Sequence, residues 1–304
     1  MESVNVRLAT HAMGTRFELV LNGQDESFLR AVGEEAIAEI QEQHARLSVF
    51  DRGSLLSRVN ALGAERWVEI DRDLLELLML CRRVWEESDG AFDPAVGGLM
   101  RRWGFRGEVG PAAGAVAGGF ESVEIDEANS SVKLGAGVEL DLGGVAKGYA
   151  LDRVWERMRA LGVERGIIHG GTSTVVAIGS PPGVGAWRVQ VPSGASEAGL
   201  LDVHLRDGAL SVSSPSGRER VEDGLMVGHV MDVRCGKPAR GARAAAVAGA
   251  SAAEADAWAT ALVVLGQRPH RMPVNLSSAI AGDGCWKVEQ QDAVFVTNGT
   301  QDGR

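Results

Sequence analysis

The stretch VELDLGGVAKGYALDRV, residues 138–154, changes character twice along its length. Apolar and polar residues alternate at 138–142, which predicts a strand, and the segment Val145–Leu161 has the apolar spacing of a helix. Gly143 and Gly144 lie between the two segments. Glycine permits a sharp turn, so the chain is expected to turn here between the strand and the helix. The stretch therefore predicts a strand, a tight turn and a helix, and it contains Lys147 and two aspartates, Asp141 and Asp152.

This junction also has the features of an anion-binding site. The first backbone N–H groups of a helix have no partner inside the helix, and Gly143 and Gly144 would let a ligand approach them. Lys147 lies in the first helical turn, where its charge opposes the positive end of the helix dipole, so a bound phosphate explains it better. A plain turn with a solvated lysine explains this stretch about equally well, because short glycine motifs are common. Asp152 has no assigned function, and we expect it to be solvated or to cap a helix.

The rest of the chain favours an α+β fold, with mixed or antiparallel sheets and several long helices packed on them, because strands come in hairpin-like runs between the helices. Helical periodicity predicts further helices at 26–46, at 71–90 with Asp71 or Asp73 as the N-cap, and at 250–266 with Gly266 as the stop. Strand patterns occur at 16–23, 66–70, 120–126, 131–137, 165–179, 186–193, 200–214 and 229–239. Residues 284–299 are expected to form a hairpin, and the Gly/Ala-rich run 107–119 a flexible loop.

Composition restricts the classes of function. The chain has 304 residues, a net charge of −10 and a pI of about 5.2, so a broad nucleic-acid surface is not expected. Its three cysteines, Cys81, Cys235 and Cys285, have neither a zinc-site spacing nor a disulfide pattern. No segment has the apolar length of a membrane span, and residues 1–23 have no signal-peptide pattern, so a cytoplasmic location is expected. A chain whose leader had been removed would look the same.

The segment AEADAWATAL, residues 253–262, offers a candidate metal site. Asp256 and Thr260 are four residues apart and share one face of the predicted helix. Both carry the hard oxygen atoms that Mg²⁺ prefers. Taken alone, a surface aspartate and a threonine bonded back to a carbonyl are the simpler interpretation.

Three further positions are weaker candidates. His229, in HVMDVRCGKPA, could serve as a general base, although a half-buried histidine in a sheet is more common. Asp93 precedes Pro94 and is first of all a turn residue. His169, next to the Gly170-Gly171 pair, is as easily a packed histidine as a ligand.

The order of these segments resembles the FAD:protein FMN transferases, the ApbE family. Six segments match its motifs in order, from Met13 to Gly266. They are HAMGTRFELVL (11–21), LSVFDRGSLLSRVN (47–60), GAFDPAVGGLMRRWGF (90–105), LDLGGVAKGYALDRV (140–154), HVMDVRCGKP (229–238) and ADAWATALVVLG (255–266). The central motif, Asp-Leu-Gly-x-x-Ala-Lys-Gly-Tyr-Ala-x-Asp, is matched almost residue for residue. The resemblance implies a single domain over 1–304, related to the T-fold, whose FAD site can lie between two lobes.

The resemblance also implies a reaction. Members of the family bind FAD with a divalent metal, usually Mg²⁺, and pass FMN to a threonine hydroxyl of an acceptor protein with release of AMP. The metal would be held by Asp256, Thr260 and the carbonyl of Gly144, His229 would be the base, and Lys147 would assist catalysis at the phosphates. The FAD site would be lined by Met13, Phe50, Ala91, Phe92, Asp93, Asp141, Lys147 and the backbone near Val230.

The sequence departs from the family pattern at five positions. His169 and Thr172 replace an asparagine and an aspartate around the Gly-Gly pair, Val233 and Cys235 replace a proline and a threonine, and Phe50 replaces a common tyrosine. The changes near His229 and the Gly-Gly pair bear on acceptor recognition and on transfer. A metal-dependent FAD pyrophosphatase and a non-catalytic flavin-binding protein are the alternatives. No acceptor-like Asp-x-x-Thr-Gly-Ala-Thr segment is found, so self-flavinylation is not expected.

Overall fold

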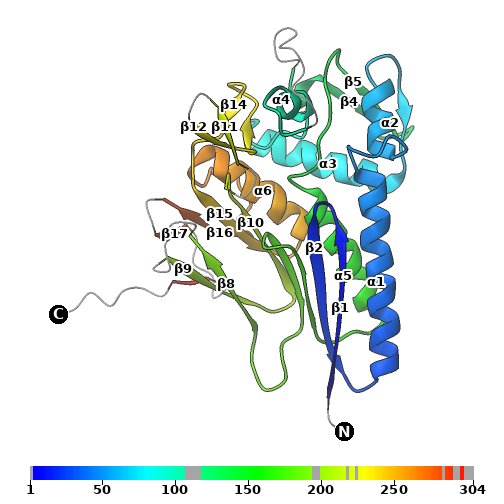
Figure 1. Cartoon of the computed structure of the whole chain (residues 1–304), viewed down its shortest axis with the longest axis vertical. Helices are drawn as coiled ribbons and strands as arrows, with labels where there is room; N and C mark the ends of the chain where they lie inside the picture. The colour runs from blue at the N-terminus through cyan, green and yellow to red at the C-terminus, as the bar shows by residue number, and fades with distance from the viewer. Residues whose placement is uncertain are drawn as a thin grey trace, which may run out of the picture.

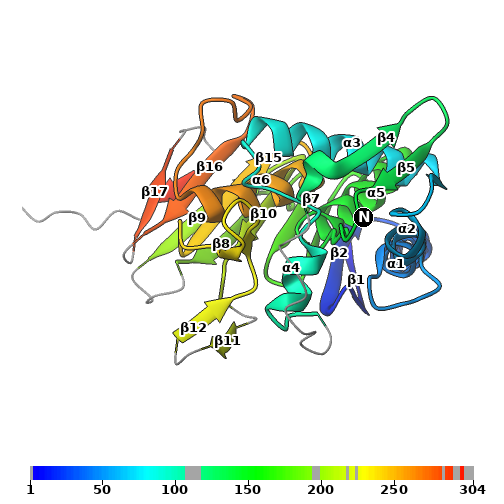
Figure 2. The ribbon, with the colours of Figure 1, turned by 90° about the horizontal axis from the view of Figure 1, so that it is seen from above.

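The computed structural model describes residues 3–106, 118–193, 199–216, 219–222, 225–282, 285–289 and 295–297. Its centre is an eight-stranded sheet with the order β1-β2-β6-β7-β10-β15-β16-β17. Figure 2 shows this sheet extending from β1 and β2 at one end to β16 and β17 at the other. The strands are β1 (Val4–Ala12), β2 (Thr15–Gly23), β6 (Gly166–Gly170), β7 (Thr174–Ile178), β10 (Gly208–Ser213), β15 (Ala244–Gly249), β16 (Ser277–Ala281) and β17 (Trp286–Val288). All strand pairs in the described residues are antiparallel, which confirms the α+β class.

Both faces of the central strands are covered. Helices α1 (Glu26–Leu47), α5 (Ala146–Ala160) and α6 (Ala252–Leu265) pack on one face (Figure 1). The small sheet of β8 (Trp187–Pro192), β9 (Leu200–Leu205) and β18 (Phe295–Thr297) packs on the other. Strand β15 is buried on both of its faces: Ala245 and Val247 pack with α6, whereas Ala246 packs with β9. A strand that is buried on both faces carries the continuous apolar run seen in AAAVAG.

The predicted helices form, and their end signals act as expected. Helix α3 (Arg72–Glu87) has Asp71 as its N-cap, because the Asp71 carboxylate accepts a hydrogen bond from the N–H of Leu74. Helix α6 ends at Gly266, whose φ of 71° is the left-handed conformation that glycine adopts without strain. Strands β1, β15 and β16 of the central sheet, helix α2 (Leu55–Leu62), and the short strands β11 (Glu219–Glu222) and β12 (Leu225–Gly228) were not predicted from the sequence. The remaining elements are α4 (Gly97–Arg102), a 3₁₀ turn at Phe120–Ser122, β3 (Val68–Glu69), β4 (Val123–Asp126), β5 (Ser131–Leu134), β13 (Met231–Asp232) and β14 (Lys237–Pro238).

Two predictions about strands are wrong. Residues 138–142 form no ladder, because their backbone groups bond to the Asn60 side chain and to the backbone of the loop that begins at Pro94. The expected hairpin at 284–299 is also absent from the described residues: β17 pairs with β16, and β18 pairs with β9 in the other sheet. The segment 138–142 and β18 bond to partners distant in sequence, which local alternation does not reveal, whereas β17 forms a hairpin with β16, a strand that was not predicted.

Residues 107–117 of the predicted loop 107–119 lie outside the described residues. None of the helices in the described part of the chain is long and apolar enough to span a membrane.

Candidate active site

A cavity of about 1150 Å³ lies where the start of α5, the middle of α6, the loop after α1 and strands β8 and β10 meet. It exceeds the usual range of about 300–1,000 Å³ for small-ligand pockets, so it has room for a large ligand. Every site residue proposed from the sequence lines this cavity. They are Met13, Phe50, Ala91, Phe92, Asp93, Asp141, Gly144, Lys147, His229, Val230, Asp256 and Thr260.

Asp256 is a buried carboxylate on α6, with only 2% of its surface exposed. The Ser211 hydroxyl donates to its Oδ1 at 2.7 Å, and the backbone N–H of Gly148 donates to its Oδ2 at 3.2 Å. The Lys147 ammonium lies 3.5 Å from Oδ2 and donates to the Gly143 carbonyl at 3.2 Å. These contacts compensate the buried charge, and the two carboxylate oxygens still have acceptor capacity for a cation. The alternative of a surface aspartate is excluded.

Thr260 lies one turn further along α6. Its hydroxyl donates to the carbonyl of Asp256 at 3.1 Å, as the simpler interpretation predicted, and lies 3.2 Å from the Ser213 hydroxyl. A Cβ built on Gly144 would lie 3.2 Å from Thr260 Oγ1 and 3.5 Å from the ring of Phe92, so Gly144 contacts this side of α6 closely. The three proposed metal ligands therefore converge at one end of the cavity.

The oxygen atoms at this end fit a hard cation better than a transition metal. One carboxylate, one hydroxyl and one backbone segment meet there, and these oxygen donors are the type that Mg²⁺ binds. The described residues contain no cluster of three histidines, cysteines or acids that could hold a metal. An ion such as Mg²⁺ at Asp256 would take its other ligands from water and from substrate phosphates, as Mg²⁺ commonly does.

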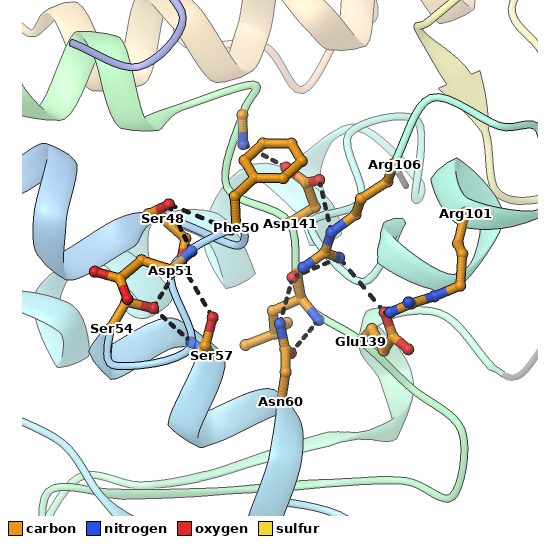
Figure 3. Close-up of polar contacts among 12 residues, drawn as sticks. Ser48, Phe50, Asp51, Ser54, Ser57, Asn60, Arg101, Arg106, Glu139 and Asp141 are labelled. Atoms are coloured by element: carbon orange, nitrogen blue, oxygen red, sulfur yellow. Dashed lines mark hydrogen bonds and ion pairs between the residues drawn. The ribbon is translucent and has the colours of Figure 1, made fainter. Parts of the chain in front are cut away.

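The segment before α5 is held by side chains from distant parts of the chain (Figure 3). Asn60 bonds both backbone groups of Leu140, accepting from its N–H at 2.7 Å and donating to its carbonyl at 2.9 Å. Asp141 accepts from the N–H of Gly143 at 2.9 Å, and its other oxygen lies 4.0 Å from the guanidinium of Arg106. Asp141 thus connects the glycine turn to a buried cation at the cavity wall.

Phe50 lies at the cavity margin with 74% of its surface exposed. Its loop is held by internal bonds: the Ser48 hydroxyl accepts from the N–H groups of Phe50 and Asp51, and Ser54 donates to the Ser48 carbonyl at 2.5 Å (Figure 3). An exposed aromatic ring on a fixed loop provides a flat apolar face for a planar ligand. The fold does not need this ring for its core.

Asp93 is a half-buried acid that also lines the cavity. Its carboxylate accepts from the N–H of Ala95 at 2.7 Å and of Phe120 at 3.1 Å. Burial raises the pKa of the Asp93 carboxyl from its usual 3.8 to about 6, because these two bonds only partly offset the loss of water.

The departures from the family pattern fall into two groups. His169 and Thr172 line the main cavity together with Phe50. The His169 Nδ1 donates to the Gly171 carbonyl at 3.0 Å, and its Nε2 lies 3.3 Å from a carboxylate oxygen of Glu18. Val233 and Cys235 instead line a second hollow of about 790 Å³ beside Trp85 and Arg271.

Three polar residues of the site were not predicted from the sequence. Arg106 lines the cavity as a nearly buried guanidinium, and no local pattern marks it, since its partners lie 33 or more residues away. Ser211 and Ser213 alternate on β10, and both bond residues of α6. The period of two in GALSVS was a usable signal, because it places both hydroxyls on one face of the strand.

Comparisons with known proteins identify the family of this chain. The sequence model of the ApbE family matches residues 13–278. The FAD:protein FMN transferase of Rhodobacter capsulatus is 30% identical over 269 residues, which are 84% of this chain and 51% of the relative, so the chain spans about half the length of that protein. The FAD:protein FMN transferase of Klebsiella pneumoniae (strain 342) is 28% identical over 299 residues, 94% of this chain and 87% of the relative. The crystal structure of the ApbE protein of Thermotoga maritima is similar with a TM-score of 0.84 and 27% identity, over 95% of this chain and 98% of the other. The chain therefore belongs to the ApbE family.

Proposed function

We propose that this protein is an FAD:protein FMN transferase that cleaves the pyrophosphate of FAD and attaches FMN to a threonine hydroxyl of an acceptor protein, releasing AMP. One observation carries the proposal: Asp256, Thr260, Gly144 and Lys147 meet at one end of a cavity whose margin carries the exposed ring of Phe50. The names of the relatives from R. capsulatus and K. pneumoniae support the same activity.

The residues at the start of α5 are suited to a pyrophosphate. Asp256, Thr260 and Gly144 would hold a divalent ion such as Mg²⁺, which when bound supplies positive charge to the phosphate oxygens. Lys147 already lies at this point with its ammonium between Asp256 and the Gly143 carbonyl. Phosphoryl transfer depends mainly on such positioning and charge neutralisation.

His229 is the proposed general base, because it lines the same cavity and a histidine can accept a proton near neutral pH. It would take the proton of the threonine hydroxyl while the hydroxyl oxygen attacks the phosphorus on the flavin side. The new O–P bond forms as the bridging P–O bond breaks, and AMP leaves with the bridging oxygen. Lys147 would stabilise the negative charge that develops on the phosphate oxygens.

A second candidate function is hydrolysis of FAD to FMN and AMP, with water in place of the threonine. The observation that favours it is the position of His169 and Thr172, since both departures from the family pattern line the cavity itself. Asp256, Thr260 and Lys147 match the family pattern, so a site altered at His169 and Thr172 would keep the groups for FAD cleavage while its acceptor region differs.

Product analysis separates these functions. The protein is incubated with FAD and Mg²⁺, with and without a peptide that carries an Asp-x-x-Thr-Gly-Ala-Thr segment. AMP together with flavin bound covalently to the peptide supports transfer, and AMP with free FMN supports hydrolysis. No AMP in either reaction would refute both enzymatic functions.

The same assay tests the proposed metal site. We expect Asp256→Ala to abolish metal-dependent release of AMP. Glu254→Gln is the matched control, because Glu254 lies on the same helix but pairs with Arg83, and it should keep wild-type turnover. Unchanged turnover in Asp256→Ala would show that the metal is bound elsewhere.

A further inference from the structure

Asp152, the aspartate of the central motif without an assigned function, binds the start of a neighbouring helix. It lies on α5, yet its carboxylate accepts three hydrogen bonds from the first residues of α6. The Ser251 hydroxyl donates to Oδ2 at 2.7 Å, the N–H of Ala252 to Oδ1 at 2.7 Å and the N–H of Ala253 to Oδ2 at 2.9 Å. The capping role expected from the sequence is therefore present, but it acts on α6 and not on α5.

The reverse contact completes a reciprocal arrangement. Within the described residues, no side chain of α5 caps its own N-terminus, where Val145 is the N-cap. Asp256 of α6 accepts from the N–H of Gly148 in the first turn of α5. A carboxylate of α5 thus binds two N–H groups at the start of α6, and a carboxylate of α6 binds one N–H in the first turn of α5. Each contact also places a negative charge at a positive helix end. Figure 1 shows the two helices packed against each other over the sheet.

Gly148 makes the close approach possible. A Cβ at this position would lie 2.2 Å from the carbonyl oxygen of Ala252. The backbones of the two helices therefore touch where the proposed metal ligands begin, and a shift of α6 would move Asp256 directly.

We propose that Asp152 is a positioning residue for the metal-binding end of the site. It fixes the start of α6, and so holds Asp256 and Thr260, four and eight residues past Ala252, in register with Gly144 at the start of α5. This inference rests on the proposed function. Residues that orient the groups bound to a metal commonly change metal affinity by 10–100-fold when mutated.

The test compares two isosteric variants of the full chain. In Asp152→Asn, an NH₂ group replaces one of the two carboxylate oxygens. The N–H of either Ala252 or Ala253 then has no acceptor on residue 152. Asp25→Asn is the matched control: Asp25 caps α1 through a single bond from the N–H of Phe28, which asparagine can also accept.

Two quantities are measured. The first is the Mg²⁺ concentration that gives half-maximal release of AMP from FAD, which we expect to rise about tenfold in Asp152→Asn while kcat at saturating Mg²⁺ stays within about twofold. The second is the hydrogen-exchange rate of the Gly148 amide without metal or FAD. It should increase in Asp152→Asn although Gly148 does not bond Asp152, because Asp256 moves with α6. Neither quantity should change in Asp25→Asn.

The outcomes are distinct. Faster exchange confined to Ala252 and Ala253, with the wild-type Mg²⁺ dependence, would overturn the proposal, because Asp152 would then be only a local cap. If Asp152→Asn does not fold, Ser251→Ala, which removes one of the three bonds to Asp152 and also the Ser251 cap of the Glu254 N–H, is used with the same two readouts. A wild-type protein that releases no AMP would refute the proposed function, whereas the Gly148 exchange rate would still test the positioning of Asp256.

Discussion

Replacing Gly148 by alanine tests how closely α5 and α6 must approach at the site. The added Cβ would lie 2.2 Å from the oxygen and 2.5 Å from the carbon of the Ala252 carbonyl, and 2.7 Å from the Cα of Ala253. All three atoms belong to the backbone, so no side chain can turn away. The helices would have to separate by about 1 Å to restore normal contact distances.

Two opposing effects determine how much Gly148→Ala changes the unfolding free energy. Overpacking against a rigid backbone costs about 3 kcal/mol, at the upper end of the usual range. Alanine gains about 1 kcal/mol over glycine in helix propensity. These two effects lower the unfolding free energy by about 2 kcal/mol, and breaking the bond from the Gly148 N–H to Asp256 adds about 1 kcal/mol, so the variant should lose about 2–3 kcal/mol.

Urea unfolding of Gly148→Ala and wild type measures the stability difference, and a Mg²⁺ titration of AMP release measures the effect on the site. Gly185→Ala is the control, because a Cβ there would meet no atom within 4 Å. It should unfold like wild type. A Gly148→Ala protein that is as stable as wild type and has an unchanged Mg²⁺ dependence would refute the packing described for α5 and α6.

Three further predictions concern the cavity wall. Phe50→Ala should leave the unfolding free energy within about 0.5 kcal/mol of wild type, because the ring is exposed. The same variant should weaken FAD binding by about 1–3 kcal/mol in a fluorescence titration, and an unchanged FAD affinity would exclude stacking on this ring. Because the pKa of Asp93 is raised, the folded protein binds more protons than the unfolded chain between pH 4 and 6. The contribution of Asp93 to the unfolding free energy therefore falls as the pH rises through that window, by about 3 kcal/mol in total. Asp93→Asn should remove this decline from the unfolding free energy measured against pH, and an unaltered pH profile would contradict the burial of a protonated Asp93. Arg106→Leu should raise the KM for FAD, because Asp141 loses a buried cation. Arg101→Leu removes only an exposed partner of Glu139 and should leave this KM unchanged. Equal effects of the two variants on the KM would exclude a specific role for Arg106.

Local signals predicted the helices well and the sheet pairing less well. The helix of residues 71–90 was predicted with its N-cap because Asp71 and the apolar spacing lie within one segment. The strand expected at 138–142 did not form, because Asn60 satisfies the backbone of Leu140 from 80 residues away. The tail strands likewise pair with β16 and β9 and not with each other.

The same distinction applies to the site. The family motifs brought together residues that line one cavity, from Met13 to Thr260. Arg106 and Ser211 were missed because their importance comes from tertiary neighbours that no spacing encodes. The partners of Asp152 lie about 100 residues along the chain, so its sequence position suggested a cap but could not show which helix it caps.

The most direct test of the proposed function is the ratio of AMP released to flavin bound covalently to an acceptor peptide, measured by chromatography and mass spectrometry after incubation with FAD and Mg²⁺. Transfer at the cavity of Asp256 and His229 predicts one AMP for each FMN attached to the peptide's threonine, and neither product with Asp256→Ala. A peptide that remains unmodified, or modification that persists in Asp256→Ala, would contradict the account.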